Sequence, residues 1–182
     1  MASIEEKILL FIQEHIRVEG LTPFVSFFTH LGNAGILFIV LTVFGLFFVS
    51  TRKAAISSAL GLVIHLIICN GILKNAFART RPYEVIDGLQ ILIEKQPDFS
   101  FPSGHTSAAF AFAVAVFLNM DRKYGIFALV LAFLMGLSRL YVGVHYPTDV
   151  LVGAIVGVLC GWLGSKLADL LMKKSKNCKK VD

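Results

Sequence analysis

Long apolar runs separated by short polar turns cover most of this chain and predict helices that cross a membrane. Each run approaches or exceeds the ~20 residues that a helix needs to cross the hydrocarbon layer of a bilayer. We therefore expect an all-α integral membrane helical bundle of five to six transmembrane helices, forming a single domain over residues 1–182. The runs are residues 24–49, with a break around Gly32, and residues 54–73, 106–120, 124–141 and 147–172.

The first residues follow a different pattern. Over residues 4–16 a helical period places Ile8 and Ile12 near one side of the helix and Glu5 and Glu14 near the other. Such a segment is too short and too charged to cross a membrane. We therefore expect an N-terminal amphipathic helix that lies at the membrane interface.

A polar segment separates the second apolar run from the third. Residues 75–101 contain Pro82, Gly88 and Pro97, which break helices and favour turns. We expect a loop here, with one short helix near residues 89–93.

Composition and charge support the membrane assignment. The chain is 56% hydrophobic and only 16% charged, with a mean hydropathy of +0.75, whereas soluble domains carry about 25% charged residues. The net charge of +5 is concentrated at residues 52–53, 122–123 and 173–182. Such clusters are typical of cytoplasmic loops and argue against a nucleic-acid partner. Residues 173–182 are thus predicted to form a basic cytoplasmic tail, which places the opposite ends of the spans outside.

Three polar motifs lie at those outer ends, and the first contains Lys74 and Arg81, followed by Pro82. The planar fork of arginine and the point charge of lysine both suit the oxygens of a phosphate group. An alternative is that these cations are interfacial anchors whose side chains reach the headgroups, and we interpret Arg79 in this way.

The second motif is Pro-Ser-Gly-His at residues 102–105. Ser103 suits the N-cap of the third span, where free backbone N–H groups attract anions and Gly104 lets an anion approach closely. His105 could give a proton to a leaving oxygen, because imidazole titrates near pH ~6.5. An ordinary capped helix start would explain the same residues.

The third motif contains Arg139, His145 and Asp149. Pro147 suits the first position of the last span, which puts Asp149 in the first turn, within reach of the His145 ring. A histidine oriented by a carboxylate presents its other nitrogen as a nucleophile. Arg139 adds a third cation. Capping of a helix at the membrane interface is the alternative interpretation of the His145 and Asp149 pair.

Taken together, the motifs resemble the three-part signature of the type-2 phosphatidic acid phosphatase superfamily, which includes bacterial lipid phosphatases and vanadium haloperoxidases. The resemblance covers residues 74–149 and implies that His145 is the nucleophile, that Asp149 orients it and that His105 is the general acid. It also implies phosphate binding by five residues, without a metal or other cofactor. These are Lys74, Arg81, Ser103, Gly104 and Arg139.

This resemblance implies a multi-pass enzyme of the cell membrane that hydrolyses a lipid phosphate through a phosphohistidine intermediate. A site on the extracytoplasmic side favours undecaprenyl pyrophosphate, since that lipid is released there, and the compact length is similar to that of small phosphatases for this substrate. Phosphatidylglycerophosphate and phosphatidate are the alternative substrates. A non-catalytic carrier of lipid phosphates is the alternative class of protein, and a haloperoxidase is disfavoured because its vanadate chemistry belongs to large soluble chains.

Overall fold

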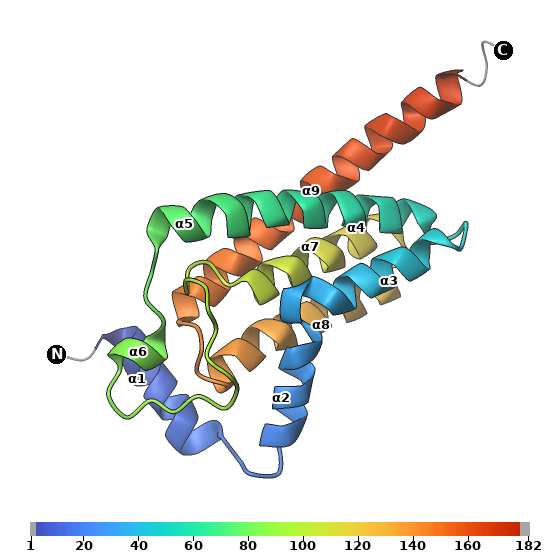
Figure 1. Cartoon of the computed structure of the whole chain (residues 1–182). Coiled ribbons are helices and arrows are strands. Elements are labelled where there is room, and N and C mark those ends of the chain that lie inside the picture. The colour runs from blue at the N-terminus through green and yellow to red at the C-terminus, as the bar shows by residue number, and fades with distance from the viewer. Residues whose placement is uncertain (1–2, 179–182) are drawn as a thin grey trace.

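The computed structural model of this chain describes residues 3–178, and helices are the regular elements found there (Figure 1). The predicted all-α fold is therefore confirmed. The elements are α1 (Ile4–Phe11), η1 (Ile12–Ile16), α2 (Thr22–Leu31), η2 (Asn33–Gly35), α3 (Ile36–Leu46), α4 (Arg52–His65), η3 (Leu66–Leu73), α5 (Lys74–Phe77), α6 (Pro82–Val85), α7 (Gly104–Asn119), α8 (Arg122–Tyr141) and α9 (Pro147–Cys178).

The N-terminal segment is helical over the predicted residues 4–16, as α1 followed by the π-helical turn η1. It begins with a capping box, in which the Ser3 side chain accepts a hydrogen bond from the Glu6 backbone and the Glu6 carboxylate accepts one from the Ser3 backbone. Leu9 is buried in a small cluster that includes Tyr146, just before α9. This packing holds α1 against the start of α9; its position at the membrane interface stays a prediction.

Helices α2 and α3 together correspond to the first predicted span, and they are bent by 49° relative to one another. The bend is made by the single turn η2, where Ala34 has φ 52° and Gly35 has φ 69°. Glycine adopts this left-handed conformation freely, whereas an alanine there costs about 1 kcal/mol. The chain thus accepts backbone strain to make this break.

The other predicted spans also correspond to helices in the structure. Helices long and apolar enough to cross a membrane cover Arg52–Val85, Arg122–Tyr141 and Pro147–Lys174, and the bent pair α2–α3 raises their number within residues 3–178 from three to four. The remaining predicted span is α7, which has 16 residues and is shorter than these. The chain is therefore a multi-pass membrane protein whose fifth apolar helix is short.

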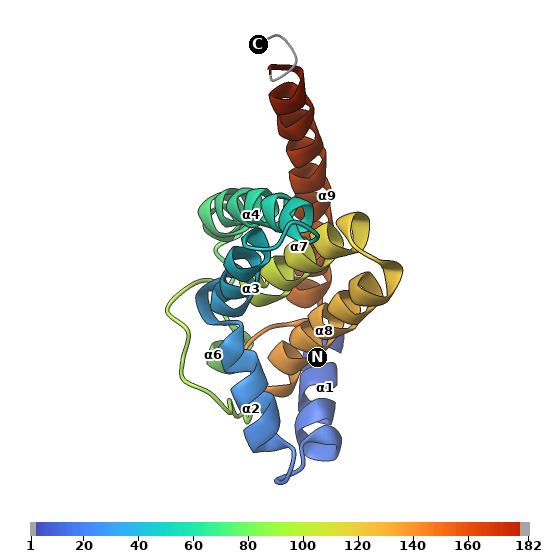
Figure 2. The same ribbon diagram turned by 90° about the vertical axis from the view of Figure 1, so that its right-hand side faces the viewer.

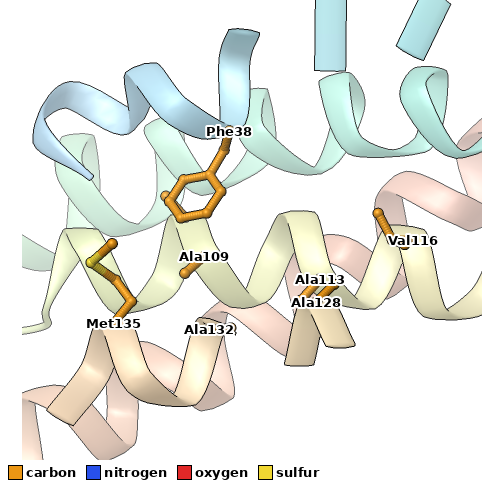
Figure 3. Close-up of a cluster of buried hydrophobic side chains, with 8 residues drawn as sticks. Phe38, Ala109, Ala113, Val116, Ala128, Ala132 and Met135 are labelled. Carbon is orange, nitrogen blue, oxygen red and sulfur yellow. The ribbon is translucent and has the colours of Figure 1, made fainter. Parts of the chain in front are cut away.

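Helix α7 occupies the centre of the bundle, between α4, α8 and α9 (Figure 2). Its small side chains let neighbouring helices approach closely. Figure 3 shows Ala109 of α7 near Ala132 of α8 and Ala113 of α7 beside Ala128 of α8, with Phe38 of α3 above Ala109. This close packing fixes the position of the first turn of α7, which carries the second motif.

Helix α9 approaches α7 even more closely, through a row of glycines. A Cβ atom at Gly157 would lie 2.4 Å from the backbone oxygen of Ser107, and one at Gly161 would lie 2.5 Å from that of Ala111. Because no side chain fits at either position, the two backbones are in direct contact. The contact holds the first turns of α7 and α9, and thus the second and third motifs, side by side.

The polar segment after α4 differs from the prediction. The prediction of a helix at residues 89–93 is wrong. The short helices of this part of the chain are α5 and α6. The backbone of residues 89–93 is used in long-range contacts: Leu92 donates to the Val142 oxygen at 3.2 Å, and Gln90 donates to the Gln13 side chain at 2.7 Å. These bonds replace the local bonds that a helix would need.

The C-terminal segment also differs. Residues 173–182 were expected to be a tail, but α9 continues to Cys178, so the first part of this segment belongs to the last helix. Residues 179–182 of the predicted tail lie outside the described residues. Figure 1 shows that the end of α9 extends well beyond the other helices, on the side away from α1.

Candidate active site

His145 and Asp149 form a buried pair at the start of α9. Pro147 is the first residue of this helix, as predicted, and it places Asp149 in the first turn. His145 Nδ1 lies 3.4 Å from Asp149 Oδ2, and both side chains are almost completely buried. The same carboxylate oxygen accepts hydrogen bonds from Ser100 Oγ at 2.5 Å and from the Tyr146 backbone at 2.9 Å. The carboxylate is therefore firmly held beside the imidazole ring.

Burial decides the protonation state of His145. It lowers the pKa of this histidine well below the ordinary value, and the charges of Arg81 and Arg139 act in the same direction, while Asp149 opposes them. The imidazole is therefore neutral at pH 7. With its Nδ1–H directed at Asp149, the Nε2 atom carries the free lone pair. A ring in this state can act as a nucleophile.

The second motif begins α7, as predicted from its sequence. Ser103 is the N-cap and accepts a hydrogen bond from the Thr106 backbone. The Ser103 N–H donates to the backbone oxygen of Asp149 at 3.0 Å, which joins this motif to the third. A Cβ atom at Gly104 would lie 3.7 Å from Lys74 Nζ. The start of α7 thus lies against the first motif as well.

The three cations predicted to bind phosphate, Lys74, Arg81 and Arg139, are all buried. Arg81 Nη1 donates to the Val144 backbone oxygen at 2.8 Å, next to the turn that carries the third motif. Arg139 Nη1 donates to Thr29 Oγ1 at 2.7 Å, but its Nε and Nη2 atoms are buried without a partner among the described residues. Buried donors without an acceptor cost free energy, and an anion bound here would satisfy them.

Asp98 belongs to the same cluster, although the sequence analysis missed it. Its carboxylate pairs with Lys74 and also with Arg81, at 2.5 Å for the second pair. Burial raises the pKa of Asp98, but the hydrogen bonds and charges of Lys74 and Arg81 outweigh burial and hold the pKa below its ordinary value. The ionised carboxylate of Asp98 therefore forms ion pairs with two of the three cations. An acid in a polar loop carries no spacing signal that would have identified it.

Arg79 is not a free interfacial anchor, contrary to our interpretation of the sequence. Its Nη1 donates to Asp149 Oδ1 at 2.7 Å and to Thr148 Oγ1 at 2.8 Å, and its Nη2 donates to Glu5 Oε2 at 2.6 Å. Glu5 Oε1 also accepts the Thr148 N–H at 3.1 Å, which caps α9. Burial raises the pKa of Glu5, but these hydrogen bonds have the larger, opposite effect. The pKa of Glu5 is therefore below its ordinary value. Arg79 and Glu5 together brace Asp149 from the side opposite His145.

A cavity of about 480 Å³, lined by both polar and apolar side chains, lies beside His105, between the start of α7 and the break η2. Lys74, Asp98 and Gly104 line it as well, so it borders the first two motifs. Of the eight predicted site residues, Lys74, Gly104 and His105 line this cavity, whereas the His145 and Asp149 pair does not. Hydrogen bonds from Ser103 to Asp149 and from Arg81 to Val144 connect the three motifs. The other buried histidine, His65, is used within the core, where its Nδ1 lies 2.8 Å from Ser107 Oγ.

Metal ligands are not grouped in the described part of the chain. No set of three His, Cys, Asp or Glu side chains there could hold a metal ion together. The site consists instead of one buried imidazole with its carboxylate, a second imidazole and three cations. This chemistry suits an oxyanion such as phosphate.

Comparison with known proteins agrees with this geometry. The model of the PAP2 superfamily matches residues 54–173, a range that contains all three motifs. The chain belongs to the PAP2 superfamily.

Several members of the PAP2 superfamily resemble the chain over most of its length. An undecaprenyl-diphosphatase of Sulfolobus acidocaldarius is 31% identical over 131 residues, covering 72% of this chain and 63% of the relative. Phosphatidylglycerophosphatase B of Bacillus subtilis is 34% identical over 163 residues, covering 81% of this chain and 75% of the relative. The crystal structure of Aquifex aeolicus LpxE has a TM-score of 0.79 at 28% identity, covering 91% of this chain and 96% of the other.

The match to these PAP2 proteins is partial in length. In three of the relatives, the aligned region spans only 51%, 63% and 58% of the relative's length. The comparisons therefore show the family and the fold of this chain.

Proposed function

We propose that this chain is a membrane phosphatase that removes the terminal phosphate of a lipid phosphate or pyrophosphate through a phosphohistidine on His145. The observation that supports this most directly is the surroundings of that ring. A neutral buried imidazole, oriented by Asp149, lies among cations of which Arg139 has unpartnered donors. Binding a phosphate would require only the cations, so the oriented imidazole favours an enzyme over a carrier.

In the first step, His145 Nε2 attacks phosphorus in line with the bond to the lipid oxygen. A P–N bond forms while the P–O bond breaks, and His105 gives a proton to the departing oxygen. Asp149 stabilises the positive charge that develops on the His145 ring.

In the second step, His105 acts as a base and takes a proton from water. The resulting hydroxide oxygen attacks phosphorus, the P–N bond breaks, and phosphate leaves while His145 returns to its neutral form. His105 is then protonated and ready for another cycle. The protons therefore balance over one turnover without a metal or other cofactor.

Phosphate binding is assigned to the five residues of the three motifs. Lys74, Arg81 and Arg139 would neutralise the phosphoryl oxygens, while Ser103 and Gly104 would offer the helix start. Asp98 has to leave Lys74 and Arg81 before a phosphate can bind both. The phosphate of the substrate therefore takes the place of the Asp98 carboxylate beside Lys74 and Arg81.

The names of the relatives support a polyprenyl pyrophosphate as substrate. The relative from Sulfolobus acidocaldarius is named undecaprenyl-diphosphatase. A second relative from Bacillus subtilis, 37% identical over 118 residues, is named undecaprenyl-diphosphatase BcrC. The basic loops at residues 52–53 and 122–123 lie at the opposite ends of the spans from the three motifs, which supports a site on the extracytoplasmic side of the cell membrane. The name of phosphatidylglycerophosphatase B makes a glycerophospholipid phosphate the second candidate.

The test compares kcat/KM for undecaprenyl pyrophosphate, phosphatidylglycerophosphate and phosphatidate in one detergent, because this ratio reports binding of the transition state. We expect the polyprenyl substrate to lead. A preference of tenfold or more for a glycerophospholipid, about 1.4 kcal/mol in transition-state terms, would support the second candidate.

The mechanism is tested by variants. His145→Ala should abolish turnover while still binding lipid phosphate, and rapid quenching of the wild-type enzyme with ³²P-labelled substrate should trap an acid-labile phosphoenzyme. Turnover near the wild-type rate in His145→Ala would exclude the covalent route. Binding without turnover in the wild-type protein would instead support a lipid-phosphate carrier.

A further inference from the structure

The side chain of Asn33 contacts His105, far away in the sequence. Asn33 Oδ1 lies 2.9 Å from His105 Nε2. Asn33 is the first residue of the break η2, whose left-handed Ala34 and Gly35 turn the chain between α2 and α3. The preceding Gly32 also meets the ring, since a Cβ atom there would lie 2.8 Å from His105 Cδ2. The chain at the break η2 therefore packs directly against the His105 ring.

The contact determines which nitrogen of His105 exchanges a proton. The amide oxygen of Asn33 can only accept a hydrogen bond, so His105 Nε2 carries the hydrogen. That leaves Nδ1 as the atom that gains and loses a proton. The bond from Nε2 is the same in the neutral ring and in the imidazolium ion. The Asn33 contact can therefore persist through both steps of a reaction.

We propose that Asn33 is a positioning residue that orients His105 and confines its proton exchange to Nδ1. This inference rests on the proposed function, because it concerns the donation of a proton to the departing lipid oxygen. Asn33 and His105 line the same cavity as Lys74. The oriented ring thus borders a space into which a leaving group can extend.

The neutrality of Asn33 suits this role. The charged and titratable groups around His105 are Lys74, Arg81, Arg139 and His145, with Asp98 and His65 in the same cavity. A carboxylate in direct contact with Nε2 would stabilise the imidazolium ion and hinder release of its proton. An amide oxygen fixes the ring without holding the proton in this way.

The test is a comparison of two leaving groups in Asn33→Ala and Asn33→Asp. Lipid phosphates have poor leaving groups that need a proton, whereas p-nitrophenyl phosphate releases a stable anion. Since general acid catalysis contributes about 10²- to 10⁴-fold, we expect Asn33→Ala to lower kcat for the lipid phosphate by about tenfold or more. For the aryl phosphate the change should be less than about twofold, because its departure needs little acid catalysis.

Asn33→Asp separates positioning from simple stability. The new carboxylate keeps an acceptor at the same place, so activity on the lipid phosphate should partly return. Because the carboxylate favours the imidazolium ion, the basic limb of the kcat profile should move to higher pH.

Asn119→Ala is the matched control. Asn119 lies at the other end of α7, where it donates to the Ala115 backbone and to the Ser57 and Ser165 side chains. Loss of the Asn119 side chain should leave the ratio of the kcat values for the two substrates unchanged. The inference is overturned if Asn33→Ala lowers both activities equally, or if it leaves lipid turnover intact. A wild-type protein that hydrolyses neither substrate would instead refute the proposed function.

Discussion

Glu5 and Arg79 form an ion pair, with 2.6 Å between Glu5 Oε2 and Arg79 Nη2, that connects the N-terminal helix to the site. The other terminal nitrogen of Arg79 holds Asp149 at 2.7 Å. Glu5 lies outside the three motifs, and Arg79 lies within the first motif but is not one of the residues predicted to bind phosphate. Residues 4–16 are therefore part of the support for the site as well as an amphipathic segment.

The first prediction concerns this ion pair. Glu5→Ala should lower kcat by about tenfold with a smaller effect on KM, because a displaced Asp149 misorients the nucleophile. Glu5→Gln should lose less, since an amide oxygen can still accept one of the hydrogen bonds. The control is Glu6→Ala, which removes a charge from the same helix but breaks only the capping bond to Ser3. Equal losses in Glu5→Ala and Glu6→Ala would show that the effect comes from α1 as a whole.

The second prediction concerns Asp98, whose carboxylate occupies Lys74 and Arg81. Asp98→Asn should bind inorganic phosphate severalfold more tightly, because a neutral amide competes less well for two cations. The inhibition constant of phosphate measures this effect. Asp87→Asn removes an exposed acid from the same loop and should leave the constant unchanged. Weaker binding of phosphate in Asp98→Asn would mean that the carboxylate arranges the cations for the substrate.

The third prediction concerns pH. Because burial depresses the pKa of His145 in the folded protein, its ring should show no titration between pH 5.5 and 7.5, near the ordinary value of about 6.5. NMR spectra of ¹³C-histidine protein, assigned by comparison with His145→Asn, would report this directly. Below about pH 6.5 the unfolded chain binds a proton at His145 that the folded chain does not, so this residue makes the fold less stable as pH falls. A midpoint near pH 6.5 would refute the depressed pKa.

The fourth prediction concerns orientation in the membrane. Asp87 and Asp121 are both exposed, and they lie at opposite ends of the spans. In a chain whose native cysteines have been replaced, Asp87→Cys should react with a membrane-impermeant thiol reagent added to intact cells, whereas Asp121→Cys should react only after lysis. Labelling of position 121 in intact cells would invert the proposed orientation.

The fifth prediction concerns metal ions. The proposed steps use only protein side chains, and the described residues contain no cluster of three metal ligands. We therefore expect activity to survive dialysis against EDTA with less than about a twofold change. Complete loss of activity that Mg²⁺ restores would require a different assignment of the site.

The sequence predicted those parts of the site that depend on local rules. Ser103 caps α7 and Pro147 begins α9, because capping serines and first-turn prolines act on their own helix ends. Apolar run lengths located the spans for a similar reason. The π-helical turn η3, which precedes Lys74, carries no comparable signal in its residues.

The residues that the sequence analysis missed all act over long distances. Asp98 reaches Lys74 across 24 residues, Asn33 reaches His105 across 72, and Glu5 reaches Arg79 across 74. Such contacts depend on how the helices pack, and periodicity says nothing about which loop acid or amide ends beside which cation. The helix expected at residues 89–93 failed for the same reason, since backbone partners elsewhere in the fold replaced local ones.

The length of α9 links the two faces of the membrane mechanically. Its 32 residues make a rod of about 48 Å, whereas the hydrocarbon layer is about 30 Å thick. Asp149 lies in the first turn of this rod, and Lys173 and Lys174 lie near its other end. Anionic headgroups attract each lysine near a membrane surface by about 1 kcal/mol, so we expect the lipid composition of the leaflet opposite the site to affect the tilt of this helix. Because the helix is continuous, any such tilt would also move the Asp149 carboxylate relative to His145.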